Sequence, residues 1–454
     1  MRRVLGTCKR MSLSTIFFLG CLAIIPLALA CGSDGGEKET ATATVAAPTA
    51  TAPAVTASAT AVETSATTPA GTAIAPGAAP GITDKEIILG QHAMLSGTFG
   101  AVYSILPRTH QAYFKYINET QGGVCGRQIV LKVEDSANDP ARALEVTRKL
   151  VEQDRVFAIF GGVGDLPHSS VQPYLNDNGV PDLFITGGAH AFGADPQKYP
   201  WSVGGVPDYR IEGMFFAQYI SQNLPGKKVG VLYENQYLGW DGLEGVRAGL
   251  DPEKNQIVSE QVYDATAIDI RSQIINMKDV GADVVILYST PAFTAQAIKQ
   301  ADRLDWHPQF MASYTNSDPL LFNFVSPQLA EGLISFNAFK LPDATDDPAI
   351  AKHYEIMRQY DGPSPGVFSI YAQLTAEVMI EALSRTCDNL TRQGLMDAVE
   401  SLRDYHSDLL LPGVTITISD TDHWTLQAGP MEHVVVMPSG KGKWEYFGPV
   451  FTFE

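Results

Sequence analysis

The stretch that decides the fold is KVGVLYENQYLGWDGLEGVRAGLDPEKNQIVSEQVYDATAIDIRSQIINMKDVGADVVILYS, from Lys228 to Ser289. Its runs KVGVLYE, QIVSEQVYD and ADVVILYS are short, apolar and rich in β-branched residues, which is typical of buried strands. The segments between them, WDGLEGVRAGL and IDIRSQIINMKDV, carry the apolar spacing of amphipathic helices. Strands that alternate with helices of this length predict a parallel sheet with helices on both faces.

The same alternation extends in both directions along the chain. We expect strands in EIILGQH, QIVLKVED, VFAIFGG, DLFIT and QFMAS, with helices between them that include one started by Pro107 and one near 168–178. Three more helical stretches are expected near 349–360, 367–384 and 392–401, followed by short strands in VTITIS, HVVVMP and KWEYF. The length fits two sheets, so the late helices should pack back on the first lobe and the chain should form a hinge between lobes.

The N-terminus indicates export. Four basic residues precede the apolar run TIFFLGCLAIIPLALA, which is too short to span a bilayer comfortably, so residues 1–30 are expected to be a signal peptide. Cys31, after Ala30 and before GSDGG, resembles a bacterial lipoprotein processing site, in which the mature chain begins at a lipidated cysteine. Cleavage at Cys21 and plain secretion are the alternatives.

A polar, low-complexity segment follows Cys31. Up to residue 80 it is almost wholly Thr, Ala, Pro, Ser, Gly and Val, without an aromatic residue, so it should not bury enough surface to fold. We expect a disordered linker over 31–80 that tethers the folded part beside a membrane partner, or equally serves as a stalk that crosses the cell wall.

Charge and cysteine usage narrow the possible partners and the cellular compartment of the protein. The chain has 32 basic and 50 acidic residues, a formal charge of −18, which argues against nucleic acid or an anionic membrane surface as a partner. Of five cysteines, two lie in the signal peptide and one is the expected anchor. The remaining pair, Cys125 and Cys387, predicts a disulfide in an oxidising compartment, with two separate buried thiols as the alternative.

Other chemistry has little support. GGVG at Gly161 follows a strand, but Pro167 stands where a dinucleotide loop has its third glycine. His168 to Ser170 lack a nucleophile elbow, and the histidines show no zinc-protease spacing. We therefore expect no enzyme activity, no cofactor and no metal.

Several motifs carry a family resemblance. ITDKEIILGQHAMLSGTFG at Ile82, NDNGVPDLFITGGA, GKKVGVLYENQYLGWDGLEGVRAGL and GADVVILYSTPAFTAQAIKQADRL resemble the leucine/isoleucine/valine-binding family of type I periplasmic binding proteins, the solute-binding subunits of ABC importers. The resemblance implies an α/β fold with two doubly wound parallel-sheet lobes joined by a three-crossing hinge. It places 81–204 and 338–428 in lobe 1, and 205–337 and 429–454 in lobe 2. It also implies a monomer that is held at the membrane only by its lipid, outside the cytoplasm, and that delivers a small-molecule solute to an ABC permease.

Ligand contacts are expected in the loops that follow the strands, because ligands of open parallel sheets sit at the carboxyl ends of the strands. In amino-acid-binding relatives a hydroxyl residue and an Ala-x-Thr stretch hold the ligand carboxylate, and an acid of the second lobe holds its ammonium. Here these positions fall on Asp165, on Gly188, Ala189 and His190, and near Tyr314. A carboxylate at Asp165 would repel a ligand carboxylate, so a branched-chain amino acid is disfavoured, and an ammonium would need Asp165 or Glu234.

The same loops are rich in aromatic residues, which suits an amino-acid-like, aromatic or amide solute. The residues expected to contact it are Phe99, Tyr103, Gly164, Asp165, Gly188, Ala189, His190, Gln236, Tyr237, Thr290 and Tyr314. A stand-alone sensor subunit of the same fold is the alternative function.

Overall fold

The computed structural model of the chain describes residues 79–453. The predicted signal peptide (1–30), Cys21, Cys31 and all but the last two residues of the predicted linker (31–80) lie outside these described residues. The described part is built on two β-sheets, of five and seven strands.

The first sheet is parallel throughout. Its strands, in spatial order, are β2 (Gln128–Asp135), β1 (Glu86–Ala93), β3 (Ala158–Phe160), β4 (Asp182–Ile185) and β5 (Ser202–Gly204). The helices in this part of the chain are α1 (Gly97–Tyr103), α2 (Ile105–Gln121), α3 (Pro140–Arg148), α4 (Asp165–Ser169) and α5 (Gln172–Asp177), with a π-helical turn at Lys149–Gln153 after α3.

Side chains alternate between the two faces of β1. Ile87 and Leu89 join the core cluster that includes Leu106 and Phe114 of α2. Ile88 packs against the cluster formed with α3 and α5. Helices therefore cover both faces, as the near-continuous apolar strands predicted.

The second sheet is mixed. Its spatial order is β12 (Gly442–Thr452), β11 (Ala428–Val436), β10 (Ile334–Phe336), β9 (Gln309–Ala312), β8 (Val284–Tyr288), β6 (Lys228–Glu234) and β7 (Gln256–Tyr263). Strands β6 to β10 are parallel, whereas β11 runs antiparallel to β10 and to β12. The parallel strands agree with the predicted fold class, and the last two strands run antiparallel to each other because a short hairpin joins them instead of a helix.

Helices cover this sheet too. They are α6 (Tyr209–Asn223), α7 (Tyr237–Gly249), α8 (Arg271–Asp279), α9 (Pro291–Arg303) and α10 (Pro327–Ala330), with 3₁₀ turns at Tyr314–Asn316 and Pro319–Asn323. Within β8, Ile286 faces the cluster of α6 and α7, and Leu287 joins the cluster of α8 and α9.

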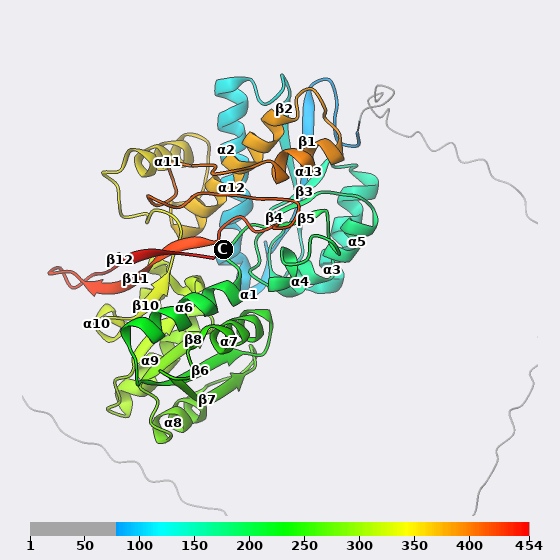
Figure 1. The fold of residues 1–454 in the computed structure, drawn as a ribbon. Coiled ribbons are helices and arrows are strands. Elements are labelled where there is room, and N and C mark those ends of the chain that lie inside the picture. The colour runs from blue at the N-terminus through cyan, green and yellow to red at the C-terminus, as the bar shows by residue number, and fades with distance from the viewer. Residues whose placement is uncertain (1–78, 454) are drawn as a thin grey trace, which may run out of the picture. The chain divides into compact units, whose positions relative to one another are not determined.

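The chain passes between the two sheets three times: after β5, after β10 and before β11. Between the second and third passages lie α11 (Pro348–Gln359), α12 (Val367–Arg385) and α13 (Arg392–Glu400). These helices lie with the blue and cyan elements of the first sheet, while β11 and β12 lie beside β10 (Figure 1).

Specific contacts fix the returning helices on the first lobe, as the sequence predicted. His110 of α2 lies 3.3 Å from the Thr375 hydroxyl of α12. Arg392 of α13 donates to the carbonyl groups of Val156 and Phe157, at 2.9 and 3.0 Å. The predicted pair Cys125 and Cys387 forms a disulfide, with the Cα atoms 5.2 Å apart.

Three local expectations are wrong. VTITIS (414–419) forms only two isolated bridges, from Ile416 to Tyr405 and from Ser419 to Asp422, because it follows a turn and pairs with no full strand. The helix expected near 168–178 is two short helices, α4 and α5, with Pro167 in the first and Pro173 at the start of the second. The segment that follows the strand EIILGQH, where a loop is expected, contains α1.

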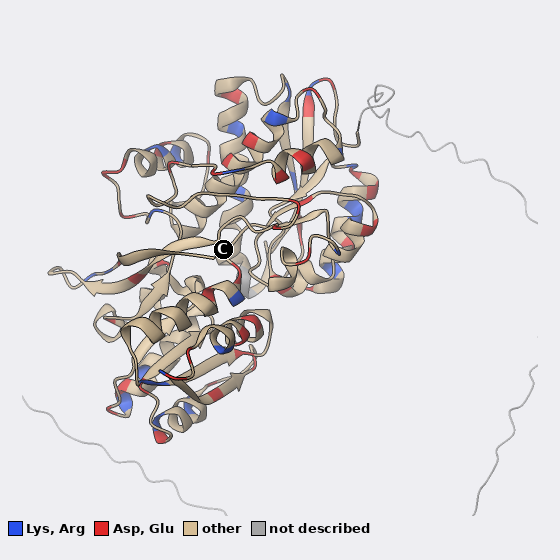
Figure 2. Ribbon diagram, viewed as in Figure 1, with Lys and Arg blue, Asp and Glu red and all other residues tan. Residues whose placement is uncertain are grey.

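Figure 2 shows acidic and basic residues interspersed over the outer helices of both lobes in this view, without one broad basic face. Among residues 79–453, no helix combines the length and the hydrophobicity needed to cross a bilayer.

Candidate functional site

A cavity of about 130 Å³ lies between the segments that follow the carboxyl ends of the parallel strands of the two sheets. It draws its walls from both lobes and from the hinge segment that leads into α6. Its lining residues are Met94, Tyr103, Asn138, Val163, Gly164, Asp165, Leu166, Thr186, Gly187, Val206, Tyr209, Glu234, Gln236, Leu238, Thr290, Pro291, Tyr314, Thr315 and Phe368.

Asp165 is the acid of the first lobe. It begins α4 directly after Gly164, which has a φ of +98°, a conformation that a side chain would strain. The carboxylate of Asp165 accepts the N–H of Ala189 at 3.1 Å and the hydroxyl of Tyr209 at 3.2 Å. Burial nevertheless raises the pKa of Asp165 to about 6.

A buried, hydrogen-bonded chain of side chains centred on His168 holds α4, which begins at Asp165, in place. His168 lies between His92, at 2.9 Å, and the Asp182 carboxylate, at 2.8 Å, and all three side chains are fully buried. His168 therefore ties the helix to β1 and β4. Its place next to Ser169 is structural, because these two residues form the last turn of α4, which ends at its C-cap Ser170.

Glu234 is the acid of the second lobe. It is the last residue of β6 and is 2% exposed. Its carboxylate accepts hydrogen bonds from the Tyr263 hydroxyl, at 2.7 Å, and from the Gln236 amide. Burial raises the pKa of Glu234, and these two donors offset part of the increase.

Aromatic rings form two pairs along the wall. The rings of Tyr209 and Tyr314 are stacked with centroids 5.7 Å apart, and those of Tyr103 and Phe368 meet edge to face at the same separation. Burial raises the pKa of Tyr103 to about 12, and the negative charges of Asp165 and Glu234 add to the increase. Tyr103 therefore lies in the field of both carboxylates.

Tyr314 is held from behind. Its backbone N–H donates to Glu212 at 2.6 Å, and its hydroxyl donates to the carbonyl group of Pro207 at 3.0 Å. Glu212 is fully buried in α6, and burial raises its pKa to about 8. The tyrosine is thus fixed to the hinge segment at both ends.

Six of the residues predicted from the sequence line the cavity: Tyr103, Gly164, Asp165, Gln236, Thr290 and Tyr314. They come from α1, from the loop after β3, and from the loops after β6, β8 and β9. The rule that loops after parallel strands meet at one edge found them. The side chain of Phe99 lies outside the described residues.

Four other predicted residues are not in the cavity lining. Gly188 is covered by aromatic side chains, since a Cβ built there would lie 2.6 Å from the Tyr209 ring and 2.7 Å from the Tyr314 hydroxyl. Ala189 is fully buried and presents its N–H to Asp165 instead of to the cavity. Gly188 and Ala189, which were expected to correspond to the Ala-x-Thr stretch of amino-acid-binding relatives, therefore lie behind the cavity wall.

His190 and Tyr237 join the lobes beside the cavity. The N–H of His190 donates to the Asp241 carboxylate of α7 at 2.8 Å, and its ring lies 2.5 Å from Asp208. The hydrogen bond with Asp208 raises the pKa of His190. The ring of Tyr237 packs near Phe192, with centroids 6.5 Å apart.

The prediction missed residues that reach the cavity from far along the chain. Tyr209 comes from the start of α6, and Phe368 comes from α12, which returns after the second sheet. Glu234, considered only as a substitute partner for an ammonium, also lines the cavity. Its position as the last residue of a strand was a signal that could have included it.

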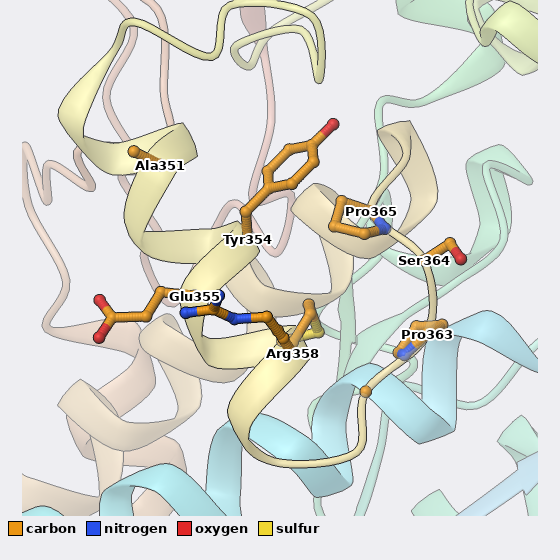
Figure 3. A pocket seen from close by; sticks show the side chains of 9 residues that line it. Ala351, Tyr354, Glu355, Arg358, Pro363, Ser364 and Pro365 are labelled. Atoms are coloured by element: carbon orange, nitrogen blue, oxygen red, sulfur yellow. The ribbon is translucent and has the colours of Figure 1, made fainter.

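A second hollow, of about 480 Å³, lies between α11 and the loop that precedes α12 (Figure 3). Tyr354 and Arg358 line it, together with Pro363 to Pro365. The carboxylate of Glu355 points away from that loop and accepts from Lys352 at 3.0 Å. This hollow is formed by one stretch of the first lobe, so closure of the lobes would not enclose it.

Comparison with known proteins identifies the family. A sequence profile described as periplasmic binding protein matches residues 86–434. The chain belongs to the type I periplasmic binding protein family. Among curated relatives, this periplasmic binding protein is 24% identical over 327 residues to Leu/Ile/Val-binding protein homolog 7 of Brucella abortus (strain 2308), covering 69% of this chain and 80% of the relative. It is 24% identical over 217 residues to the Leu/Ile/Val-binding protein of Escherichia coli (strain K12), covering 47% and 57%.

Solved structures share the fold. A branched chain amino acid ABC transporter protein from Thermus thermophilus with bound valine has a TM-score of 0.71 at 16% identity, covering 82% of this chain and 98% of that one. A fatty acid ABC transporter substrate-binding protein from Thermomonospora curvata has a TM-score of 0.70 at 23% identity, covering 84% and 97%. The resemblance and the fold class are thereby confirmed. Family members are binding proteins rather than enzymes, and the family implies an extracytoplasmic location.

Proposed function

We propose that this protein is a solute-binding lipoprotein that captures a small amino-acid-like, aromatic or amide solute between its lobes and delivers it to an ABC importer. The observation that carries the proposal is the cavity, whose walls combine one acid and two aromatic residues from each of the two lobes. A solute there would touch both lobes at once, so its binding energy would favour the closed arrangement.

In this proposal the lobes are 81–204 with 338–428, and 205–337 with 429–454, and the protein acts as a monomer without catalysis. Tyr103, Gly164, Asp165, Gln236, Thr290 and Tyr314 contact the solute. Tyr209 and Glu234 are added to them, because they line the same cavity.

A thermal-unfolding screen tests solute capture. A ligand at 100 times its dissociation constant adds about 2.7 kcal/mol of stability, which gives a clear shift of the unfolding temperature. The panel holds branched-chain amino acids, aromatic acids, amides, amines and polyols, and each hit is repeated with Tyr314→Ala. A hit that Tyr314→Ala leaves unchanged would place binding elsewhere.

Anchoring through Cys31 forms a separate part of the proposal. It rests on the basic start, the short apolar run and the small residue before the cysteine. Cys31→Ser should move the protein from the membrane fraction to the soluble extracytoplasmic fraction. A variant that stays in the membrane fraction would remove the lipid anchor from the proposal.

A further inference from the structure

The charge of the cavity is one-sided. Two acidic side chains, Asp165 and Glu234, line it, and the described lining residues include no Lys, Arg or His. Neither carboxylate forms an ion pair within the described part of the chain. The groups that donate hydrogen bonds to these two carboxylates are neutral: a backbone N–H, two tyrosine hydroxyls and an amide.

We infer that the solute is a small organic cation, an amine that carries no carboxylate, with Asp165 and Glu234 as its anionic partners. The inference rests on the proposed function, because it names the class of solute that the same cavity takes. A cation supplies the missing countercharge to two carboxylates that the protein itself leaves unpaired.

A solute carboxylate would meet the opposite situation. It would enter an enclosed space that already holds two acids, where charges are poorly screened and an unpaired charge is costly to bury. The structurally similar substrate-binding protein from Thermomonospora curvata is named for a fatty acid transporter, and a fatty acid is an anion. Such an anion does not suit this lining.

The aromatic wall suits a cation as well. Ammonium groups are attracted to the faces of Tyr and Phe rings within about 6 Å, and the attraction grows when water is excluded. The stacked pair Tyr209 and Tyr314 and the edge-to-face pair Tyr103 and Phe368 border the space that the carboxylates share.

The N-termini of two helices without a side-chain cap oppose the inference. α6 also begins at the cavity, but the carboxylate of Asp208 caps it, and α4 has only five residues. α7 begins after Gln236 and α9 after Thr290, and neither of these cap side chains bonds to its own helix. Each N-terminus carries about half a positive elementary charge, so both together offset about one of the two negative charges. A net negative cavity remains once both acids are ionised.

The size of the cavity limits the cation. Its volume of about 130 Å³ is close to the roughly 150 Å³ of an engineered protein cavity that binds benzene. An amine with one ring or one short branched chain therefore fits, whereas a long-chain amine does not.

Two matched series test the inference by calorimetry on the full protein. The first is 3-methylbutylamine, leucine and 4-methylpentanoate; the second is phenethylamine, phenylalanine and 3-phenylpropanoate. Within each series the carbon skeleton is shared and the charged groups differ. We expect at least one of the two amines to bind at least tenfold more tightly than its amino acid and its acid.

Single substitutions then identify which carboxylates bind the amine. Asp165→Asn and Glu234→Gln should each weaken amine binding at least tenfold. Asp305→Asn removes the same charge from a fully exposed side chain and should change affinity less than twofold, which controls for general attraction of cations to an acidic protein.

The other outcomes separate the two proposals. Tighter binding of leucine, phenylalanine or an acid that Tyr314→Ala abolishes would overturn the amine inference and leave solute capture intact. Amine binding that Asp305→Asn weakens as much as Asp165→Asn would also overturn it. If no compound of either series or of the wider panel binds, both the inference and the proposed function fail.

Discussion

The hydroxyl of Tyr209 donates a hydrogen bond to Oδ2 of Asp165 across 3.2 Å, and so joins the first residue of α6 to the first residue of α4. α4 belongs to the first lobe, whereas α6 packs on the second sheet. The backbone N–H of Tyr209 also donates to the carbonyl group of Gly188, at 3.0 Å. Tyr209 is thus the residue through which the hinge segment contacts the acid of the first lobe.

Tyr209→Phe should destabilise the protein in a pH-dependent way. The ring stays stacked on Tyr314, but the ionised carboxylate of Asp165 loses one of its two donors. We expect a loss of about 1–2 kcal/mol in the free energy of unfolding at pH 8 and a smaller loss at pH 5, where most of Asp165 is protonated. Urea titrations at both values measure it.

Tyr219→Phe is the matched control, because Tyr219 lies on the same helix and its hydroxyl forms no hydrogen bond with another residue of the described part of the chain. It should change the free energy of unfolding by less than 0.5 kcal/mol at either pH, as ordinary surface substitutions do. An equal loss in Tyr209→Phe at pH 5 and pH 8 would mean that the hydroxyl does not act through the charge of Asp165.

Much of the site follows from the order of strands and loops in the sequence. Asp165, Gln236 and Thr290 lie in the segments that follow the parallel strands β3, β6 and β8, and the geometry of parallel strands brings these segments to one edge. Their neighbourhood could therefore be predicted without knowing how the lobes pack.

The remaining residues depend on contacts that no local pattern encodes. Phe368 reaches the cavity because α12 returns to the first lobe more than 150 residues after its last strand. Gly188 leaves the lining because the rings of Tyr209 and Tyr314 cover it. Both outcomes are set by tertiary packing rather than by local propensity.

Glu212→Gln should flatten the dependence of stability on pH. Burial raises the pKa of Glu212 from 4.5 to about 8, so the folded protein binds this proton more tightly than the unfolded chain does. The free energy of unfolding of the parent protein therefore falls as the pH rises from about 5 to about 8, and the fall due to this group is on the order of 3 kcal/mol. The amide keeps an oxygen for the N–H of Tyr314.

The measurement is chemical denaturation of parent and variant at several values between pH 5 and pH 9. The difference between them should grow in favour of the variant as the pH rises. Glu244→Gln, an exposed acid on α7, provides a control whose difference stays constant. If the difference in the free energy of unfolding between Glu212→Gln and the parent also stays constant with pH, Glu212 does not hold its proton in the folded state.

Asp241→Ala should weaken solute binding by about three- to tenfold. Asp241 on the second lobe accepts the backbone N–H of His190 at 2.8 Å, a contact that only the joined lobes make. A hydrogen bond of this kind is worth about 1 kcal/mol or somewhat more, and a tenfold change in affinity is about 1.4 kcal/mol. Calorimetry with a solute found in the screen measures the affinity.

Small-angle scattering without solute should give a larger radius of gyration for Asp241→Ala than for the parent. Glu244→Ala removes another acid of α7, whose partner Arg210 lies on the same lobe, and should change neither quantity. If Asp241→Ala has the solute affinity and the radius of gyration of the parent, the contact between Asp241 and His190 does not contribute to lobe closure.

Replacing Cys125 and Cys387 together by Ser should lower stability without altering solute affinity. Their disulfide joins residues 262 apart, from the turn before β2 to the residue that follows the end of α12 by two positions. Closing so long a loop stabilises the folded state by about 5 kcal/mol in the chain-entropy model, because the crosslink restricts the unfolded chain. Neither cysteine lines the cavity, so solute affinity should change less than twofold.

Urea unfolding of the oxidised parent, the reduced parent and the double variant measures the effect on stability. The reduced parent and the double variant should have the same free energy of unfolding. A double variant within 1 kcal/mol of the oxidised parent would show that packing of α12 on α2 alone holds the returning helices on the first lobe.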